Sequence, residues 1–507
     1  MSFSRSSGIL LHVTSLPGQF GIGDLGKEAY NFVDFLSESG QRLWQILPLH
    51  PTGYGHSPYQ SLSIFAGNPL FISPEKLMED GFLNNIDLAS LTKFPVNSID
   101  YDAVINFKNS LLNKSFDIFE IKANSTQLND FAAFSKNNAW WLDNYSLFMA
   151  LRDFNNLSPW NTWDKDIRSW LPETIEHWNT KLSREIRFHK YLQYLFSKQW
   201  SELKTYCHGK GVKIIGDVPI YVALDSAEVW SNPHVFYIND NCQPTIVAGV
   251  PPDYFSNTGQ LWGNPLYRWD IMLKDGFTWW VERLKTEFKL VDIIRLDHFR
   301  GFEKYWAVPA SDTTAINGTW VQGPGIELFH TIQKAIGDIP VITEDLGMIT
   351  PEVKILRDEL GFPGMKVLQF AFGDESSTNE YKPHNYIRNC VVYTGTHDNN
   401  TTIGWFNGED IGVTTRSKST MDKERQHVLQ YIGTDGHEIN WDFIRIALMS
   451  IADIAIIPLQ DVLGLGGVAR MNLPGTTEGN WRWRFTSEML TDGIKQKLKE
   501  MTYLYGR

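Results

Sequence analysis

The chain has 507 residues, a formal net charge of −12, and 42% hydrophobic and 21% charged residues. This composition is typical of an ordinary soluble globular protein with a large core, and the acidic balance argues against nucleic acid as a partner, because phosphate binding needs clustered Lys and Arg. The three cysteines, Cys207, Cys242 and Cys390, are scattered without CxxC spacing, which indicates neither a disulfide framework nor a zinc site.

Neither a targeting segment nor a membrane span is indicated by the hydropathy pattern. The apolar run near the N-terminus is interrupted at His12 and Thr14, which makes it too short for a signal peptide. The longest apolar region, 444–459, is broken by Arg445 and Pro458, so it does not have the pattern of a membrane-spanning helix. We therefore expect no membrane partner and a cytoplasmic location.

Short apolar runs recur along the chain. Continuous apolar runs of this kind are typical of strands that are buried on both faces of a parallel sheet. In chain order, we predict strands at 8–13, 43–47, 212–217, 291–296, 340–343, 366–370, 391–396 and 454–459.

Helical patterns lie between several of these runs. In the first, Asp24 is a candidate cap, apolar residues from Ala29 to Leu36 recur at helical spacing, and Gly40 ends the helix. Further helices are predicted at 129–154, 174–208, 276–288, 351–360 and 441–452.

Eight strands alternating with helices predict the α/β class and, within it, an eight-stranded parallel β/α (TIM) barrel, with a doubly wound open sheet as the alternative. The stretches 48–211 and 221–275 are far too long for ordinary loops. We therefore expect a helical subdomain inserted after the second strand and a loop-rich subdomain inserted after the third. Since no repeat or linker-like sequence separates them, 1–507 is expected to fold as a single catalytic barrel.

Three acidic residues stand at the ends of predicted strands: Asp297 in IIRLDHFRG, Glu344 in PVITEDLG and Asp398 in VVYTGTHDNN. In a parallel barrel these strand ends converge on the face that carries the active site. Cleavage of a glycosidic bond requires one carboxylate that attacks the sugar and one carboxyl group that exchanges a proton. Any one of these acidic residues alone could instead cap the following helix, but the three together favour an active site for sugars.

Arg295 and Asp297 lie on the same face of their strand, because side chains alternate along a strand. If that face is the barrel interior, the guanidinium lies beside the carboxylate and keeps it ionised, as a nucleophile requires. The alternative is an ordinary buried ion pair that stabilises the end of the strand.

Glu344 and Asp345 are adjacent, so only one of them faces the cleft. Glu344 has the longer reach to a leaving oxygen, and an apolar setting would raise its pKa toward neutrality; Asp345 is expected to act as a helix cap. His397 and Asp398 are expected to hydrogen-bond sugar hydroxyls. A His-Asp metal pair is the alternative, but no partner histidines stand at ligand spacing, so we predict no metal and no cofactor.

Aromatic residues gather in two segments rich in Gly and Pro, GYGHSPYQS and GVPPDYFSNTGQLWGNPLYRW. Such segments form loops rather than helices, and flat sugar faces stack on aromatic rings. We expect 249–256 to be a mobile lid, with Gly249 as its pivot and with Tyr254 and Phe255 as stacking faces. A protein–protein surface is the alternative.

These motifs resemble those of the amylomaltases, the 4-α-glucanotransferases or disproportionating enzymes of the α-amylase clan. The resemblance covers nearly the whole chain and extends to HVTSLPGQFGIGDLG, WQILPLHPTGYGHSPYQS, IIGDVPIYVALDSAEVW, GVPPDYFSNTGQLWGNPLY and RMNLPGTTEGNWRWR. It implies an eight-stranded barrel with inserted subdomains and no separate C-terminal β-domain. It also implies action on α-1,4-glucans, that is, on maltooligosaccharides, amylose, starch or glycogen.

The resemblance further implies Asp297 as nucleophile, Glu344 as general acid/base and Asp398 as stabiliser of the distorted sugar. The substrate-binding residues that it implies are Tyr59, Asp217, Arg295, His397 and Asn472 around the donor glucose and Trp262 on the acceptor side. We add His298, Tyr254 and Phe255 as substrate-binding candidates.

Typical α-amylases carry Asn-His soon after the third-strand Asp, and the Asn helps to bind calcium. Here Val218 follows Asp217, which speaks against that calcium site and against a simple hydrolase.

The leading prediction is transfer of α-1,4-glucan segments with retained configuration. The nearest alternative is an α-glucan hydrolase that uses the same carboxylates. Two alternatives come from other classes: a metal-dependent phosphohydrolase built on His397 and Asp398, and a non-catalytic glucan-binding protein. Activity that survives a chelator would exclude the phosphohydrolase, and a binding protein has no need of Arg295, Asp297 and Glu344 at strand ends.

Overall fold

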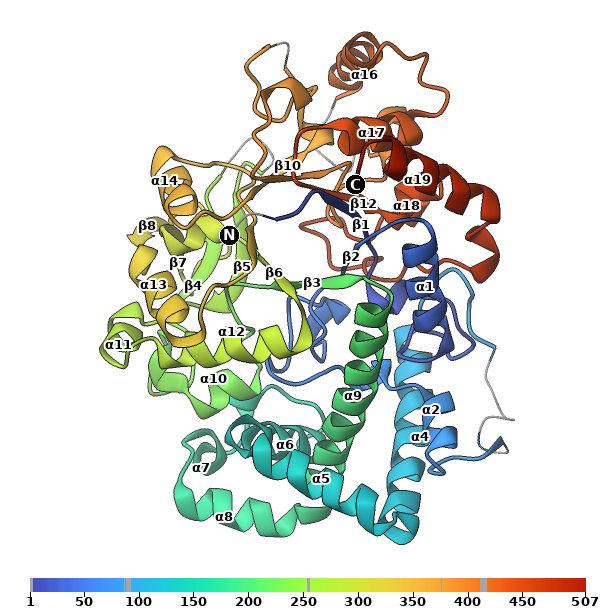
Figure 1. The fold of residues 1–507 in the computed structure, drawn as a ribbon. Coiled ribbons are helices and arrows are strands. Elements are labelled where there is room, and N and C mark those ends of the chain that lie inside the picture. Colours follow the sequence, from blue (N-terminus) through green and yellow to red (C-terminus); the bar gives the residue numbers. More distant parts are fainter. Residues whose placement is uncertain (1–2, 86, 88–92, 253–255, 375, 411–416) are drawn as a thin grey trace.

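The computed structural model describes residues 1–507 with the exception of 1–2, 86, 88–92, 253–255, 375 and 411–416. Its centre is a closed barrel of parallel strands (Figure 1). In chain order these strands are β1 (Ser6–Leu10), β2 (Leu43–Gln45), β3 (Lys213–Val218), β6 (Ile293–Leu296), β9 (Val341–Thr343), β10 (Gly364–Val367), β11 (Cys390–Tyr393) and β12 (Ile454–Pro458). Each of them overlaps one of the eight predicted runs, which confirms the prediction of a β/α barrel.

The barrel strands follow one another around the ring in chain order, and β1 closes the ring against β12. Strands such as β11 and β12 are buried at every residue, as expected for strands that pack side chains both into the barrel and against the outer helices. Gly8 lies in β1, where a Cβ atom would come within 2.3 Å of the main-chain oxygen of Leu43. Glycine therefore permits the close approach of β1 and β2.

Helices lie between the barrel strands in the chain or follow the last of them. They are α1 (Lys27–Glu38), α12 (Thr278–Leu290), α13 (Gly325–Ile336), α14 (Pro351–Glu359), α15 (Thr402–Asn407), α16 (Lys418–Ile432), α17 (Ile439–Met449), α18 (Leu459–Val462) and α19 (Asp492–Leu504). The prediction that Asp24 caps the first helix is wrong, because the capping position is Gly26. Asp24 instead accepts a hydrogen bond from the N–H of Gly26 and pairs with the buried ammonium of Lys108 at 3.1 Å.

The segment between β2 and β3 is helical. It contains α2 (Pro74–Glu79), α4 (Tyr101–Lys122), α5 (Ser125–Asn137), α6 (Ala139–Phe154), α7 (Lys165–Arg168), α8 (Pro172–Lys181) and α9 (Ser183–Gly209). Figure 1 shows α5 to α8 below the barrel, with α9 running from them toward β3. The stretch predicted as one helix at 129–154 is broken at Asn138, which ends α5 and precedes α6.

A small antiparallel sheet, which the sequence analysis did not predict, lies beside the barrel (Figure 1). Its strands are β4 (Ile246–Val250), β5 (Gln260–Pro265), β7 (Lys304–Pro309) and β8 (Thr319–Gln322), in the order β5-β4-β7-β8. The short helices α10 (Ala227–Ser231) and α11 (Trp269–Lys274) flank β4 and β5 in sequence. The expectation that Gly249 is a pivot is wrong, because Gly249 pairs with Leu261 on one side and with Trp306 on the other.

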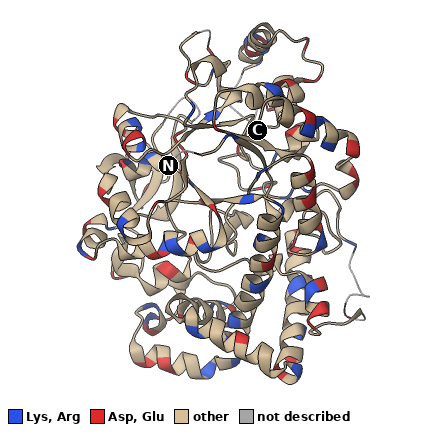
Figure 2. Ribbon diagram, viewed as in Figure 1, with Lys and Arg blue, Asp and Glu red and all other residues tan. Residues whose placement is uncertain are grey.

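One cluster of buried apolar side chains joins the barrel to the helical segment, from Trp44 on β2 to Phe116 on α4 and Trp200 on α9. The helices between β2 and β3 therefore pack onto the barrel. Charged residues follow the helices around the outside, whereas the barrel strands are mostly uncharged (Figure 2). In the part of the chain that the structure describes, no helix is both long and apolar enough to span a membrane.

Candidate active site

The three strand-end carboxylates of the sequence analysis lie at the same end of the barrel. Asp297 directly follows β6, Glu344 directly follows β9, and Asp398 lies in the loop after β11. Since all barrel strands are parallel, these positions are at their carboxyl ends, where β/α barrels carry their active sites. The side chains of Asp297 and Asp398 are 28% and 44% exposed, so both carboxylates are accessible from solvent.

Asp297 lies beside a buried arginine. Nη1 of Arg295 donates to Oδ1 of Asp297 at 3.0 Å and to both carboxylate oxygens of Asp217 at 2.7 and 2.8 Å. Asp217 and Arg295 are register partners on β3 and β6. Burial by itself lowers the pKa of Arg295, but the carboxylates of Asp217 and Asp297 raise that pKa well above its usual value. The guanidinium is therefore a fixed positive charge in hydrogen-bond contact with the carboxylate of Asp297.

Glu344 has a different environment. Burial and the neighbouring carboxylate of Asp297 raise the pKa of Glu344 to about 8, although the charge of Arg295 and two main-chain N–H groups oppose this shift. These groups are the N–H of His298, which donates to Oε2 at 2.8 Å, and the N–H of Leu346, which donates to Oε1 at 2.8 Å. A carboxylic acid held in this way carries a proton at neutral pH and has a fixed orientation.

Asp345 points away from this site, as the alternation of the two side chains predicts. The expectation that it acts as a helix cap is wrong. Its carboxylate accepts from Nη1 of Arg357 at 2.6 Å and from the N–H of Met365 at 2.7 Å. The carboxylate of Asp345 is buried, so its charge needs a partner of opposite charge, which a turn N–H cannot provide. The ion pair with Arg357 on α14 is therefore more favourable than a helix cap.

A hydrogen-bonded chain links Asp217 to the loop after β11. The hydroxyl of Tyr59 donates to Oδ2 of Asp217 at 2.8 Å and lies 2.9 Å from Nε2 of His397. Since a phenol has one proton, the hydroxyl of Tyr59 accepts from His397, which places a proton on Nε2. The same nitrogen is 3.3 Å from Oδ1 of Asp398, and Nδ2 of Asn472 donates to that oxygen at 2.6 Å.

The acceptor-side candidates are only partly described. The ring of Trp262 on β5 meets the ring of His298 edge to face, with centroids 4.8 Å apart. Burial lowers the pKa of His298 to about 4, so its imidazole is neutral at physiological pH. Tyr254 and Phe255 lie outside the described residues, as does the stretch 253–255 of the predicted lid.

Three residues that the sequence analysis did not select also belong to this region. Trp481 lies against both Tyr59 and His397, with ring centroids 6.0 Å apart in each case. Arg470 donates to the main-chain oxygen of Asp398 at 2.6 Å, and Asp461 binds both ends of the loop that carries His397. Arg470 and Trp481 stand in the same motif as Asn472, RMNLPGTTEGNWRWR, and this proximity is the signal that could have identified them.

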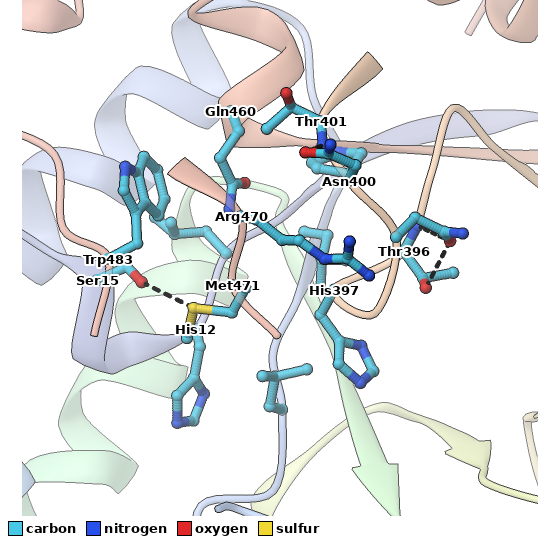
Figure 3. A pocket seen from close by; sticks show the side chains of 15 residues that line it. His12, Ser15, Thr396, His397, Asn400, Thr401, Gln460, Arg470, Met471 and Trp483 are labelled. Carbon is cyan, nitrogen blue, oxygen red and sulfur yellow. Dashed lines mark hydrogen bonds between the residues drawn. The ribbon is translucent and has the colours of Figure 1, made fainter. Parts of the chain in front are cut away.

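A pocket next to His397 extends the site toward the ends of β1, β11 and β12 (Figure 3). Its empty space is about 440 Å³ when the open solvent at its mouth is included. Polar side chains contribute to its lining, among them His12, Asn400, Gln460 and Arg470. Among the described residues, no group of three or more His, Cys, Asp or Glu side chains is placed to hold a metal ion.

Comparison with known proteins places the chain in a family. Residues 11–491 match the protein family described as 4-alpha-glucanotransferase. The chain is 48% identical to the 4-alpha-glucanotransferase of Synechocystis sp., over 99% of this chain and 98% of that protein. It is 46% identical to the 4-alpha-glucanotransferase of Thermus thermophilus, over 99% of both chains.

A solved structure is similarly close. The amylomaltase from Streptococcus agalactiae, in complex with acarbose, superposes with a TM-score of 0.94 at 39% identity, and the match covers 99% of each chain. Matches of this extent include the barrel, the helical segment after β2 and the small antiparallel sheet. The chain therefore belongs to the 4-alpha-glucanotransferase family of enzymes.

Proposed function

We propose that this enzyme moves α-1,4-glucan segments from one glucan chain to another, with retention of configuration, through a covalent glucosyl-Asp297 intermediate. The contrast between two neighbouring carboxyl groups carries this proposal. Asp297 accepts a hydrogen bond from the guanidinium of Arg295, whereas the pKa of Glu344 is raised to about 8. One group is thus suited to attack as an anion and the other to donate a proton, as a retaining mechanism requires.

In the first step, a carboxylate oxygen of Asp297 attacks the anomeric carbon of the donor glucan. The bond from that carbon to the glycosidic oxygen breaks, and Glu344 gives its proton to this oxygen as the chain segment leaves. Arg295 remains beside Asp297 and Asp217 and keeps the local charge balanced. The products of this step are a shortened glucan and a glucosyl ester on Asp297.

The second step reverses the first with a new partner. Ester formation removes the negative charge of Asp297, which is one of the two causes of the high pKa of Glu344. The pKa of Glu344 therefore falls, and the carboxylate accepts the proton of the 4-hydroxyl of an acceptor glucan as that oxygen attacks the anomeric carbon. Two inversions at the same carbon restore the α configuration.

Asp398, His397, Tyr59 and Asn472 form the side of the site that we assign to the donor glucose. Asp398 accepts from Asn472 through one carboxylate oxygen, and its exposed carboxylate is available to sugar hydroxyls that tighten their hydrogen bonds in the transition state. Trp262 is the acceptor-side candidate among the described residues, and Tyr254 and Phe255 remain candidates from the sequence. Maltooligosaccharides, amylose, starch and glycogen are the substrates that we propose.

The chain organisation and location are part of the proposal. We propose that 1–507 forms a single catalytic barrel in which 48–211 and 221–275 are insertions. The cytoplasm is the location that we propose, and the cysteines support it, because Cys207, Cys242 and Cys390 are free thiols, as is usual in a reducing compartment.

The stereochemistry of the product tests the two-step mechanism. Maltotriose and the enzyme are followed by proton NMR from the first turnover onward, and the anomeric signals of newly formed glycosidic bonds are assigned. We expect only α signals. New β linkages would indicate a single displacement and would contradict the covalent intermediate.

A further inference from the structure

Two loops meet at the carboxylate of Asp398, and one arginine holds them together. Arg470 directly follows a single 3-10 turn, Gly467–Ala469. Its Nη2 donates to the main-chain oxygen of Asp398 at 2.6 Å, and its Nε donates to the main-chain oxygen of Asn472 at 2.7 Å. The guanidinium therefore bridges the segment after β11 and the segment after α18.

This bridge determines where Asn472 meets Asp398. The side chain of Asn472 donates to Oδ1 of Asp398 at 2.6 Å, and the main-chain N–H of Asn472 donates to the oxygen of His397 at 3.1 Å. Each of these bonds requires the two segments to keep their spacing and their relative direction. Figure 3 shows Arg470 reaching from its own segment toward the loop of Thr396 and His397.

We propose that Arg470 is a positioning residue for the reaction, which orients the carboxylate of Asp398 toward the donor sugar by bridging the main chains of Asp398 and Asn472. This inference rests on the function proposed above. It goes beyond that function because Arg470 itself carries out no chemical step; it acts through Asp398.

The chemistry of arginine suits this task. A guanidinium presents its N–H donors in a rigid planar fork, so two acceptors are held at a fixed separation. An ammonium is a point donor on a flexible stem and does not impose that separation. Burial lowers the pKa of Arg470, and the carboxylates of Asp410 and Asp398 oppose that shift.

The loop has a separate anchor for its fold. Asp461, which is buried, accepts from the hydroxyls of Thr394 and Thr402 at 2.5 and 2.8 Å and from the N–H of Thr402 at 2.7 Å. These bonds fix both ends of the loop at its base, whereas Arg470 contacts its middle at Asp398. Removing Arg470 is therefore expected to change the direction of the Asp398 carboxylate while the loop stays folded.

The test compares Arg470→Ala and Arg470→Lys with a matched arginine elsewhere. Arg5, at the start of β1, also donates to main-chain oxygens, those of Ser450 and Leu448 at 2.8 and 2.9 Å. Arg5 also donates to the main-chain oxygens of Tyr505 and Ala452, so Arg5→Ala is the larger structural change, and it lies far from any carboxylate of the site. For each variant, kcat and KM on maltotriose and the melting temperature are measured.

We expect Arg470→Ala to lower kcat about 10- to 100-fold with little change in KM, since misplacement of a reacting group by about 1 Å has a cost of that order. Arg470→Lys is expected to recover little of the loss. Millimolar guanidinium chloride, far below denaturing concentrations, is expected to restore part of the activity of Arg470→Ala. Arg5→Ala should lower the melting temperature, keep kcat, and show no response to guanidinium.

Three results would overturn the inference while wild-type transfer stays intact: an unchanged kcat in Arg470→Ala, a full recovery by lysine, or a loss of kcat that follows melting temperature equally in the Arg470 and Arg5 variants. If Arg470→Ala does not fold, then Arg470 is needed for the fold, and a fully active, folded Arg470→Lys would exclude the positioning role. A wild-type enzyme that does not transfer glucans would instead contradict the proposed function.

Discussion

The main-chain N–H of His298 donates to Oε2 of Glu344 at 2.8 Å. Because His298 directly follows Asp297, this bond ties the end of β6 to the end of β9 and thereby links the proposed nucleophile to the proposed acid. His298 has a left-handed backbone, with φ of 50°, which is uncommon for a residue with a side chain. Backbone conformations of this kind persist where the surrounding structure holds them, often at functional sites.

This link leads to a geometric prediction. We expect the carboxyl groups of Asp297 and Glu344 to be about 5–5.5 Å apart, the separation of retaining glycosidases. A crystal structure with a bound glucan measures it directly. A separation of about 6.5–9.5 Å would leave room for a water between enzyme and sugar and would contradict the double displacement.

Replacement of either carboxylate should abolish catalysis and leave the fold intact. Asp297→Asn removes the nucleophile and Glu344→Gln removes the proton donor, so we expect each to lower kcat by about 10²–10⁴-fold or more. Turnover and melting temperature are measured on the same samples.

Asp345→Asn is the matched control for this experiment. Its carboxylate stands next to Glu344 in sequence but binds Arg357 on the far side of β9. We expect Asp345→Asn to lower the melting temperature and to retain turnover. If Asp297→Asn and Glu344→Gln behaved like Asp345→Asn, both carboxylates would be structural.

The raised pKa of Glu344 predicts a pH dependence of activity. Glu344 must carry its proton to act as acid in the first step, so kcat/KM is expected to fall as pH rises through about 8. Glu344→Gln should remove this alkaline limb from whatever activity remains. A wild-type profile of kcat/KM that stays flat up to pH 10 would contradict the assignment of Glu344 as the acid.

The same shift predicts a pH dependence of stability. The folded state raises the pKa of Glu344 above its usual value of 4.5, so folding favours the protonated form. The contribution of protonated Glu344 to the free energy of unfolding is fully present below about pH 4.5 and is lost as pH rises through about 8. Relative to wild type, Glu344→Gln should therefore gain in free energy of unfolding between pH 5 and 9, measured by denaturant titration. A difference that does not change with pH would contradict the raised pKa.

The hydroxyl of Tyr59 should matter through its hydrogen bonds to Asp217 and His397. Tyr59→Phe removes a donor to Asp217 and an acceptor for His397, and hydrogen bonds to charged groups contribute about 1.5–3 kcal/mol. We expect kcat/KM on maltotriose to fall roughly 10- to 100-fold, in line with that range.

Tyr206→Phe provides the comparison, because the hydroxyl of Tyr206 also donates to an aspartate, Asp34, at 2.8 Å, but on the outer helices α9 and α1. This variant should lose stability at most. Equal kinetic effects of the two substitutions would show that the loss in Tyr59→Phe is not specific to the site.

The strands and the strand-end acids could be predicted from the sequence because both signals are local. Continuous apolar runs mark β3, β6 and β11, and an acid directly after such a run marks Asp297 and Glu344. The alternation of side chains along a strand was enough to place Arg295 beside Asp297 and to point Asp345 away from Glu344.

Other features could not be predicted because they depend on contacts between distant segments. The pairing of Arg295 with Asp217 joins positions 78 residues apart in sequence, and the bridge from Arg470 to Asp398 spans 72. The strand β8 has no long run of apolar residues that distinguishes it from a loop, and only its pairing with β7, which in turn pairs with β4, defines it. Asp345 was expected to act as a cap because a local pattern cannot show that Arg357 is its partner.

Transfer depends on which oxygen attacks the glucosyl intermediate. Water is present throughout, but a reactant held in the right orientation reaches effective molarities of about 10⁵ M or more. A site that positions the 4-hydroxyl of an acceptor, with Trp262 as the described candidate for that contact, therefore favours transfer over hydrolysis. A transferase exchanges one glycosidic bond for another, so the number of reducing ends stays constant.

The most direct test is to incubate the pure enzyme with maltotriose and to follow chain lengths and total reducing ends in the same samples. The account predicts glucose together with a ladder of chains longer than maltotriose, at a constant number of reducing ends. A steady rise in reducing ends without any product longer than maltotriose would contradict it and would identify the enzyme as an α-glucan hydrolase.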